Sequence, residues 1–439
     1  MSMQEHYTFA QTYLPGGVSA TARANRALGH PLYLSHGDGA RVYDLDGRGY
    51  VDMCMSHGAS LLGHNHPAIK AAVQQALDLG IICAYETVHQ AQLAQQLAEL
   101  VPCAKQVRFA GSGTETVMHG LRLARAATGR VKIIKFEGHF HGYSDALNYS
   151  VAPPLDQAGP PEQPLAYPES AGIPANLAED LIVLPFNDVE ALEEAFAAHG
   201  TQAAALFMEP INYDSGCIIP KPGFVARCRD LCDEYGALLF FDEVLTAFRM
   251  APDCAQGYLG ITPDLCVLGK AMGAGMPISA LCGRRELMQQ LRPLGRSEMS
   301  GTYLAHLTAV LAAKAALREY HQPGFYEQLN AHGEFFYSAF QRLIAASGVP
   351  LQLQHVGPRF GLYFGITTPV TNYREAAQQD RAMLMTFIAG CIRRGAYFAV
   401  SPHHGFSAAH SKADLALVLE AIEGALHDVR LAGIDQIAN

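Results

Sequence analysis

An aspartate and a lysine stand where two apolar segments of this chain end, and together they are its strongest candidates for chemistry. Asp242 follows Ala237–Phe241, and Lys270 comes just after Leu265–Leu268. Both segments have the length and composition of buried strands. A charged group at the end of a buried strand costs free energy unless it is paired or used. Pyridoxal phosphate uses this combination, because it binds a lysine as a Schiff base and an aspartate against its pyridinium nitrogen.

A segment of small residues supplies a candidate site for a phosphate. Gly111-Ser112-Gly113-Thr114 follows a predicted strand and opens a predicted helix. Small residues let the backbone approach an anion, and the first N–H groups and the dipole of a helix favour anion binding. We therefore assign Ser112, Gly113 and Thr114 to a phosphate. The plainer alternative is a tight turn between strand and helix with Thr114 as the N-cap residue.

Two other nucleotide-binding motifs fit this chain less well. Gly111-x-Gly113 and an acid at Glu137 suggest a nicotinamide dinucleotide enzyme, but position 116 is Thr where that motif has a third glycine. A P-loop around Lys270 fails, because residue 271 is Ala and not Ser or Thr. Taken alone, Lys270 could be a solvated loop residue, and Asp242 could be a helix cap or a metal ligand.

The turn that follows the apolar segment Val131–Phe136 contains a phenylalanine and two histidines. An aromatic residue there, such as Phe140, could stack on a flat cofactor. His139 and His141 could in principle bind a metal, but no cysteine lies near and their spacing matches no familiar zinc motif. We therefore predict no metal site, and for each histidine alone we expect a hydrogen-bonded structural role.

Strand and helix patterns alternate along most of the chain and must position these residues. Strands are predicted at Gln106–Ala110, Val131–Phe136, Ala203–Met208, Ala237–Phe241 and Leu265–Leu268, and helices at Glu115–Ala127 and Gly223–Tyr235. This βαβ rhythm predicts an α/β fold with a mainly parallel sheet and helices on both faces. Ligands of such sheets bind at the carboxyl ends of the strands, where the candidate residues lie.

Other regions have different patterns. Val42–Val51 predicts a hairpin around Asp46-Gly47. Residues 151–174 hold seven prolines and predict an irregular loop, either a mobile lid or an ordered surface excursion. From residue 305 the pattern is rich in helices and indicates a separate lobe. Its predicted helices are Leu307–Tyr320, Gly324–Ser347 and Lys412–Leu431, with short strands at 362–364 and 396–400.

Composition limits the class of protein and its partners. The chain has 439 residues, 49% of them apolar, which predicts two or more lobes with a large core. A net charge of −10 argues against a nucleic-acid partner and favours small molecules or protein chains. Ten cysteines without a CxxC pair, no signal-peptide pattern at the start and no apolar run of membrane-spanning length predict a cytoplasmic protein with no membrane partner.

Taken in order, the motifs of this chain resemble the class III (fold type I) pyridoxal-phosphate aminotransferases, and most closely their glutamate-1-semialdehyde aminomutase-like branch. That branch also contains enzymes that act on aromatic D-amino acids and on β-amino acids. The resemblance extends over nearly the whole chain. It rests on Pro15-Gly16-Gly17-Val18, Gly63-His64-x-His66-Pro67, Gly111–Glu115, Gly138-x-Phe140-His141-Gly142, Glu209-Pro210, Phe241-Asp242-Glu243-Val244-x-Thr246-x-Phe248-Arg249, Leu268-Gly269-Lys270 and Ser300-Gly301-Thr302.

The resemblance implies a role for each candidate residue. Lys270 would form the Schiff base and shuttle the proton, while Asp242 would bind the pyridinium nitrogen. The remaining cofactor residues would be Phe140 and Val244 on the two ring faces, Ser112, Gly113 and Thr114 on the phosphate, Thr302 on the phosphate of a partner subunit, and His141 and Glu209 as supports. Two residues would contact the substrate. Arg23 would bind its carboxylate, and His57 stands where the aminomutases have Trp.

The resemblance also implies the architecture and the reaction. We expect a large domain (51–304) with a seven-stranded type of sheet, a smaller α+β C-terminal domain (305–439), and an N-terminal segment (1–50) that packs with the small domain. We expect a homodimer with shared active sites that transaminates an α-, aromatic or β-amino acid to its keto acid. Tyr303–His306 and Phe398–Gly405 depart from the aminomutase patterns, which favours an aminotransferase over an aminomutase. An aminomutase or racemase, and a silent binding protein with this fold, remain as alternatives.

Overall fold

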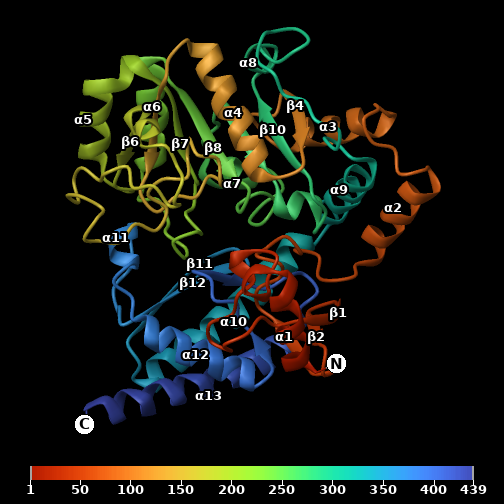
Figure 1. The fold of residues 1–439 in the computed structure, drawn as a ribbon, viewed down its shortest axis with the longest axis vertical. Helices are drawn as coiled ribbons and strands as arrows, with labels where there is room; N and C mark the ends of the chain where they lie inside the picture. Colours follow the sequence, from red (N-terminus) through yellow and green to blue (C-terminus); the bar gives the residue numbers. More distant parts are fainter. Residues whose placement is uncertain (1, 438–439) are drawn as a thin grey trace. The chain divides into compact units, whose positions relative to one another are not determined.

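The computed structural model describes residues 2–437, and the chain divides into two compact units (Figure 1). The central unit comprises Ala68–Pro323 and the short segment Val370–Ala377. The terminal unit comprises the residues up to Pro67, Gly324–Pro369 and the residues from Gln378 onward. The chain therefore passes between the units after Pro67, Pro323, Pro369 and Ala377, whereas the sequence places the divisions at residues 50 and 304.

The central unit is built on a seven-stranded sheet in the order β4-β10-β9-β8-β7-β5-β6. Its strands are β4 (Gln106–Ala110), β5 (Lys132–Phe136), β6 (Leu181–Leu184), β7 (Ala203–Met208), β8 (Leu238–Glu243), β9 (Leu265–Leu268) and β10 (Ser279–Gly283). Paired strands are parallel except for β10, which runs antiparallel to both β4 and β9. Every strand but β10 therefore ends at the same edge of the sheet. The predicted α/β fold with a mainly parallel sheet is confirmed.

Helices cover this sheet because its strands are apolar on both faces; every residue of β7 and β8 is buried. The helices of the central unit are α2 (Pro67–Asp78), α3 (Val88–Leu100), α4 (Gly113–Thr128), α5 (Val189–His199), α6 (Phe224–Tyr235), α7 (Cys254–Leu259), α8 (Arg285–Met288), α9 (Leu307–Tyr320) and α11 (Tyr373–Ala376), and of these α3, α4, α5, α6 and α8 pack on the sheet. Helix α4 lies tightly on the sheet, since a Cβ atom on Gly120 would come within 2.5 Å of the Phe240 ring. This packing fixes the position of the first turn of α4.

The terminal unit holds both ends of the chain and two small sheets. One sheet joins β1 (Leu34–Asp38), β2 (Arg41–Asp44), β3 (Gly49–Asp52) and β13 (Ala396–Tyr397); the other joins β11 (Leu351–Val356), β12 (Arg359–Phe364) and β14 (His403–Gly405). Its helices are α1 (Met3–Tyr13), α10 (Phe325–Ser347), α12 (Arg381–Arg393) and α13 (Lys412–Ile437). The hairpin around Asp46-Gly47 is confirmed as the antiparallel pair β2–β3. Helix α1 was not predicted.

The proline-rich segment 151–174 has no regular strand or helix but is held by hydrogen bonds. The Ser150 hydroxyl donates to the Leu165 carbonyl at 2.8 Å and accepts the Tyr167 N–H at 2.9 Å. The Glu169 carboxylate accepts the N–H groups of Val151 and Ala152. These bonds close the segment into an ordered surface loop at the end of β5. Within residues 2–437, no helix has both the length and the apolar character needed to cross a membrane.

Candidate active site

Two neighbouring parallel strands bring Asp242 and Lys270 to the same edge of the central sheet. Asp242 of β8 lies opposite Val267 of β9, and the next pair in register is Glu243 and Leu268. Strand β9 ends there, and Lys270 follows after Gly269. The two side chains are close enough for the negative charge of Asp242 to act on the pKa of the Lys270 amine. Asp242 and Lys270 therefore lie together at the carboxyl ends of β8 and β9, as predicted.

The Asp242 carboxylate is oriented by two donors. Its Oδ2 accepts a hydrogen bond from Nδ1 of His141 at 3.0 Å, and its Oδ1 accepts the Val244 backbone N–H at 3.1 Å. The His141 side chain is fully buried, and burial lowers its pKa although Asp242 acts in the opposite direction. A carboxylate only accepts hydrogen bonds, so Nδ1 of the neutral His141 carries the proton. A neutral imidazole thus holds a buried carboxylate.

Lys270 begins the short 3₁₀ turn Lys270–Gly273 with a backbone φ of 41°. A residue other than glycine is uncommon at such an angle and occurs where the surroundings fix it, often at functional sites. Burial lowers the pKa of the amine, while the carboxylates of Asp214, Asp242 and Glu209 partly oppose this shift. A lowered pKa increases the neutral, nucleophilic fraction of the amine.

The first turn of α4 presents free N–H groups at the same edge. Ser112 is the N-cap residue, because its hydroxyl accepts the Glu115 N–H at 3.2 Å; the alternative with Thr114 as N-cap is therefore wrong. Among residues 2–437, the backbone N–H groups of Gly113 and Thr114 have no acceptor. A Cβ atom on Gly113 would lie 2.9 Å from Val244, so the helix end approaches that side chain closely. This is a helix N-terminus open to an anion.

The turn after β5 meets the same helix end. Tyr143 donates its N–H to the Thr114 hydroxyl at 3.3 Å, and a Cβ atom on Gly142 would lie only 2.6 Å from that oxygen. Gly142 also has a φ of 86°, so the turn requires glycine there. Phe140 and Val244 are both half-buried, and each leaves apolar surface uncovered. The structure thus brings together the ring-face and phosphate residues that the sequence predicted.

Glu209, which follows β7, supports this turn from the neighbouring strand. Its Oε1 accepts the Phe140 N–H at 3.0 Å, and its Oε2 accepts the Tyr213 N–H at 3.2 Å. Burial raises the pKa of this carboxyl well above its usual range, and the charges of Asp214 and Asp242 act in the same direction. Glu209 therefore lies beside the candidate site, as a link between two loops.

These residues fit pyridoxal phosphate. The open N–H groups at the start of α4 suit a phosphate, and the uncovered faces of Phe140 and Val244 suit a flat ring. Asp242 is oriented and buried as a partner for a pyridinium nitrogen, and Lys270 has the lowered pKa that an amine nucleophile needs. The site therefore offers each interaction that this cofactor requires.

Sequence reasoning missed Lys135 and the pairing of Glu137 with Arg374, both next to the turn. Lys135 of β5 is fully buried, and its amine donates to the His139 carbonyl at 3.0 Å and to the Tyr149 carbonyl. Glu137 forms a two-pronged ion pair with Arg374 of α11, at 2.9 and 3.1 Å. A lysine inside an apolar strand was a visible signal for the first group. No local pattern could have joined Glu137 to Arg374, which is 237 residues away.

The Glu137–Arg374 pair also bears on the dinucleotide alternative and on the proline-rich loop. Both carboxylate oxygens of Glu137 are occupied by the guanidinium, so the acid expected to bind a ribose already has a partner. The same guanidinium donates to the carbonyls of Ala158 and Gly159, and the Tyr373 hydroxyl donates to the Pro153 carbonyl. Helix α11 therefore fastens the loop to the end of β5.

Three predicted residues lie outside this cluster of contacts. Arg23 ends a short 3₁₀ turn, Thr21–Arg23, and is exposed, with a hydrogen bond to Ser19. His57 is half-buried with a φ of 51°, and its ring lies 6.4 Å from that of His403. Both belong to the terminal unit. Thr302 lies on an exposed turn of the central unit, where its carbonyl accepts the Ala84 N–H at 3.1 Å. The predicted roles of these three residues remain predictions.

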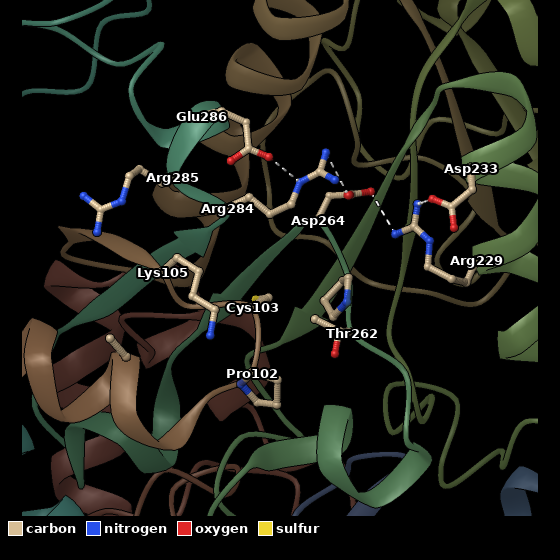
Figure 2. A pocket seen from close by; sticks show the side chains of 12 residues that line it. Pro102, Cys103, Lys105, Arg229, Asp233, Thr262, Asp264, Arg284, Arg285 and Glu286 are labelled. Atoms are coloured by element: carbon tan, nitrogen blue, oxygen red, sulfur yellow. Dashed lines mark hydrogen bonds and ion pairs between the residues drawn. The ribbon is translucent and has the colours of Figure 1, made fainter.

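A separate hollow of about 620 Å³ lies at the opposite edge of the same sheet (Figure 2). Asp264, just before β9, accepts from Arg229 at 2.9 Å, from Arg284 at 3.1 Å and from the Leu239 N–H at 2.7 Å. The carboxylate is thereby neutralised and ties together the amino ends of β8 and β9. None of the candidate cofactor residues lines this hollow. The contacts of Asp264 therefore link the two strands at this edge.

Comparison with known proteins agrees with this geometry. Residues 22–393 match the family described as aminotransferase class-III. An omega-transaminase from Sphaerobacter thermophilus shares 31% identity over 97% of both chains, with a TM-score of 0.91. A β-phenylalanine aminotransferase from Variovorax paradoxus shares 29% identity over 96% of this chain and 92% of its own, with a TM-score of 0.85. A glutamate-1-semialdehyde aminomutase from Pseudomonas aeruginosa PAO1, at 22% identity over 97% and 94% of the two chains and a TM-score of 0.86, shares the fold.

Proposed function

This chain belongs to the class III aminotransferase family, and from that premise we propose that Lys270, Asp242 and the first turn of α4 carry out a transamination with pyridoxal phosphate. The cofactor follows from the family. The observation that carries the residue assignment is the meeting of β8, β9 and the start of α4 at one edge of the sheet. Amino acids and keto acids are the substrates of such an enzyme.

We assign each residue a task that the family resemblance implies and its surroundings support. The N–H groups of Gly113 and Thr114, with the Ser112 hydroxyl nearby, bind the phosphate. Phe140 and Val244 would enclose the ring between apolar surfaces, and Asp242, held by His141, would keep the ring nitrogen protonated. Pyridoxal phosphate, when bound, supplies an electron sink that stabilises negative charge on the carbon next to the amine. Lys270 binds the cofactor and moves the proton to and from that carbon.

The substrate is proposed to be an amino acid whose carboxylate is bound by Arg23, with His57 beside it. A guanidinium suits this task because its parallel N–H groups match a carboxylate. Among donors, we propose β-amino acids as the first class to test. Support comes from the name of one similar protein, a β-phenylalanine aminotransferase.

The first test is the visible absorption spectrum of the purified protein, before and after mixing with D-, L- and β-amino acids. We expect a yellow protein whose band is bleached by β-amino acids faster than by their α-isomers. Lys270→Ala should lose turnover and hold the cofactor weakly and non-covalently, whereas Lys105→Ala, at an exposed lysine of the same unit, should behave as wild type. Unchanged turnover in Lys270→Ala would refute the assignment.

Measuring turnover in these mixtures with and without an added keto acid separates the alternatives. An aminotransferase needs a second keto acid for continued turnover, whereas an aminomutase or racemase turns over without one. A silent binding protein would stay colourless after pyridoxal phosphate is added. Bleaching by α-amino acids alone would leave the transamination standing but exclude the β-amino acid preference.

We further propose a homodimer with shared active sites in the cytoplasm. Apolar side chains are exposed around the Thr302 turn, namely Ile81, Tyr85, Val88 and Tyr303, and exposed apolar groups that gather in one region favour a protein interface. All ten cysteines are free thiols, as is usual in a reducing compartment. Light scattering during size-exclusion chromatography tests the dimer: a wild-type mass near 47 kDa, the mass of one chain, would contradict it.

A further inference from the structure

Two crossed hydrogen bonds, which the proposed chemistry does not use, join the segment His139-Phe140 to Glu209. The Glu209 backbone N–H donates to Nδ1 of His139 at 3.0 Å. In return, the Glu209 carboxylate accepts the backbone N–H of Phe140 at 3.0 Å. The side chain of each residue thus accepts a hydrogen bond from the backbone of the other segment. These two bonds, His139–Glu209 and Glu209–Phe140, connect the turn after β5 to the loop after β7, and we call them the clip.

The clip fixes the chemical state of the His139 ring. A backbone N–H can only donate, so Nδ1 of His139 must accept and carry no proton. His139 has no exposed surface, and burial lowers its pKa well below the usual value, with the neighbouring His141 and Lys135 acting in the same direction. The ring is therefore neutral, with its proton on Nε2. A cationic imidazole, with protons on both nitrogens, could not form this bond.

The clip lies directly beside the two residues of the turn that face the candidate site. Phe140 and His141 are the next two residues, and they provide the apolar ring face and the hydrogen bond to Asp242. The carbonyl of Gly138, the residue before His139, accepts from Asn212 at 3.0 Å and from Ser215 at 2.9 Å, in the same loop as Glu209. Gly138, His139 and Phe140 are thereby anchored in succession to the loop after β7.

We propose that His139 is a positioning residue for the cofactor site: through Nδ1 it anchors Glu209, and so sets the places of Phe140 and His141 against the ring and against Asp242. The inference rests on the proposed function, because the ligand that responds to this positioning is pyridoxal phosphate. Residue 139 itself does not reach the reacting atoms. Its effect passes through its two neighbours in sequence and through Glu209.

The test uses two substitutions that differ in one property. His139→Leu removes the acceptor and leaves the buried Glu209 N–H without a partner, which weakens the site. His139→Asn keeps an acceptor oxygen close to the place of Nδ1. Both lose the packing of the imidazole against Phe186, whose ring centroid is 4.7 Å away. If His139 only filled space, Asn would be no better than Leu.

We would prepare the apoproteins and titrate them with pyridoxal phosphate, following the visible band. His139→Leu should bind the cofactor about 5- to 100-fold more weakly than wild type, and His139→Asn should recover most of that loss. His332→Leu serves as the control, because His332 is a buried histidine of the terminal unit whose Nδ1 has no hydrogen-bond partner. Equal weakening in both His139 variants, or none in His139→Leu, would overturn the proposal.

A second measurement does not depend on the cofactor. In ¹⁵N-histidine-labelled apoprotein, the His139 signals should show an unprotonated Nδ1 and a protonated Nε2 between pH 6 and 8. Signals that show a protonated Nδ1 would overturn the clip, whatever the binding data show. If instead the wild type binds no pyridoxal phosphate while the tautomer is as expected, the failure lies with the proposed function and not with the clip.

Discussion

Lys135 allows a quantitative prediction about pH, because it is a lysine with no exposed surface. Its amine contacts the carbonyls of His139 and Tyr149, and burial lowers its pKa from 10.5 to about 7. The unfolded chain keeps its proton up to pH 10.5, whereas the folded protein releases it near pH 7. Between these values the unfolded state binds more protons, so this residue makes the protein more stable as pH rises.

The size of the effect follows from the two pKa values. Below pH 7 the full cost of burying the charge applies, and one pKa unit corresponds to about 1.4 kcal/mol. Between pH 7 and pH 9, Lys135 should therefore add about 2 kcal/mol to the free energy of unfolding. Lys135→Met removes this contribution. The variant should lose about 2 kcal/mol relative to wild type over that interval, whatever its stability at pH 7.

Urea denaturation of the apoproteins at pH 7, 8 and 9 measures this difference. A chain with two units need not unfold in one step. We would therefore compare, between wild type and variant under the same conditions, the unfolding transition that reports on the central unit. Lys132→Met is the matched control: Lys132 lies on the same strand, is half-buried and reaches the Glu179 carbonyl at 3.2 Å. Parallel pH profiles for wild type and Lys135→Met would refute the reasoning.

Two further substitutions test separate parts of the structure. Arg374→Met leaves the buried Glu137 carboxylate without its cation and should destabilise the central unit by about 3–5 kcal/mol in urea denaturation. The more exposed pair Arg125–Asp180 is the control, since Arg125→Met should cost about 1 kcal/mol or less, and equal costs would contradict the argument. Arg23→Ala should raise KM at least about tenfold for amino acid donors but leave KM for simple amines unchanged, because only the former carry a carboxylate. Steady-state kinetics decide this, and equal changes in both values of KM would exclude the assigned role.

Much of the central sheet could be predicted because its strands and helices have recognisable local patterns of apolar residues. Apolar strands bounded by helices reproduced β4, β7 and β9 with their observed bounds, and α9 as well. Helix α1 shows how a local signal can be overlooked. Ser2 and Glu5 form a capping box there, which is a recognisable start signal, yet no helix was predicted in this segment.

The parts of the site that escaped prediction depend on partners far away in the chain. Asp242, Lys270 and the start of α4 could be found because each lies at or just after the end of a strand that is visible in the sequence; β8 itself extends through Asp242 to Glu243, two residues further than predicted. His139 received only a general structural role, since its partner Glu209 is 70 residues away. The partner of Arg374 is more distant still. Such pairs are set by the order of strands in the sheet, which no local pattern contains.

Helix α11 has a consequence for the order in which the protein is completed during synthesis. Glu137 leaves the ribosome 237 residues before Arg374, which at ordinary translation rates is a delay of roughly 10 to 50 seconds. Until then the carboxylate lacks its cation, and the proline-rich loop lacks the bonds from Tyr373 and Arg374. The large sheet can form early, but the loop beside the candidate site is fastened only when almost the whole chain has been made. A nascent chain stopped before residue 370 should therefore be cut by proteases first at 151–174.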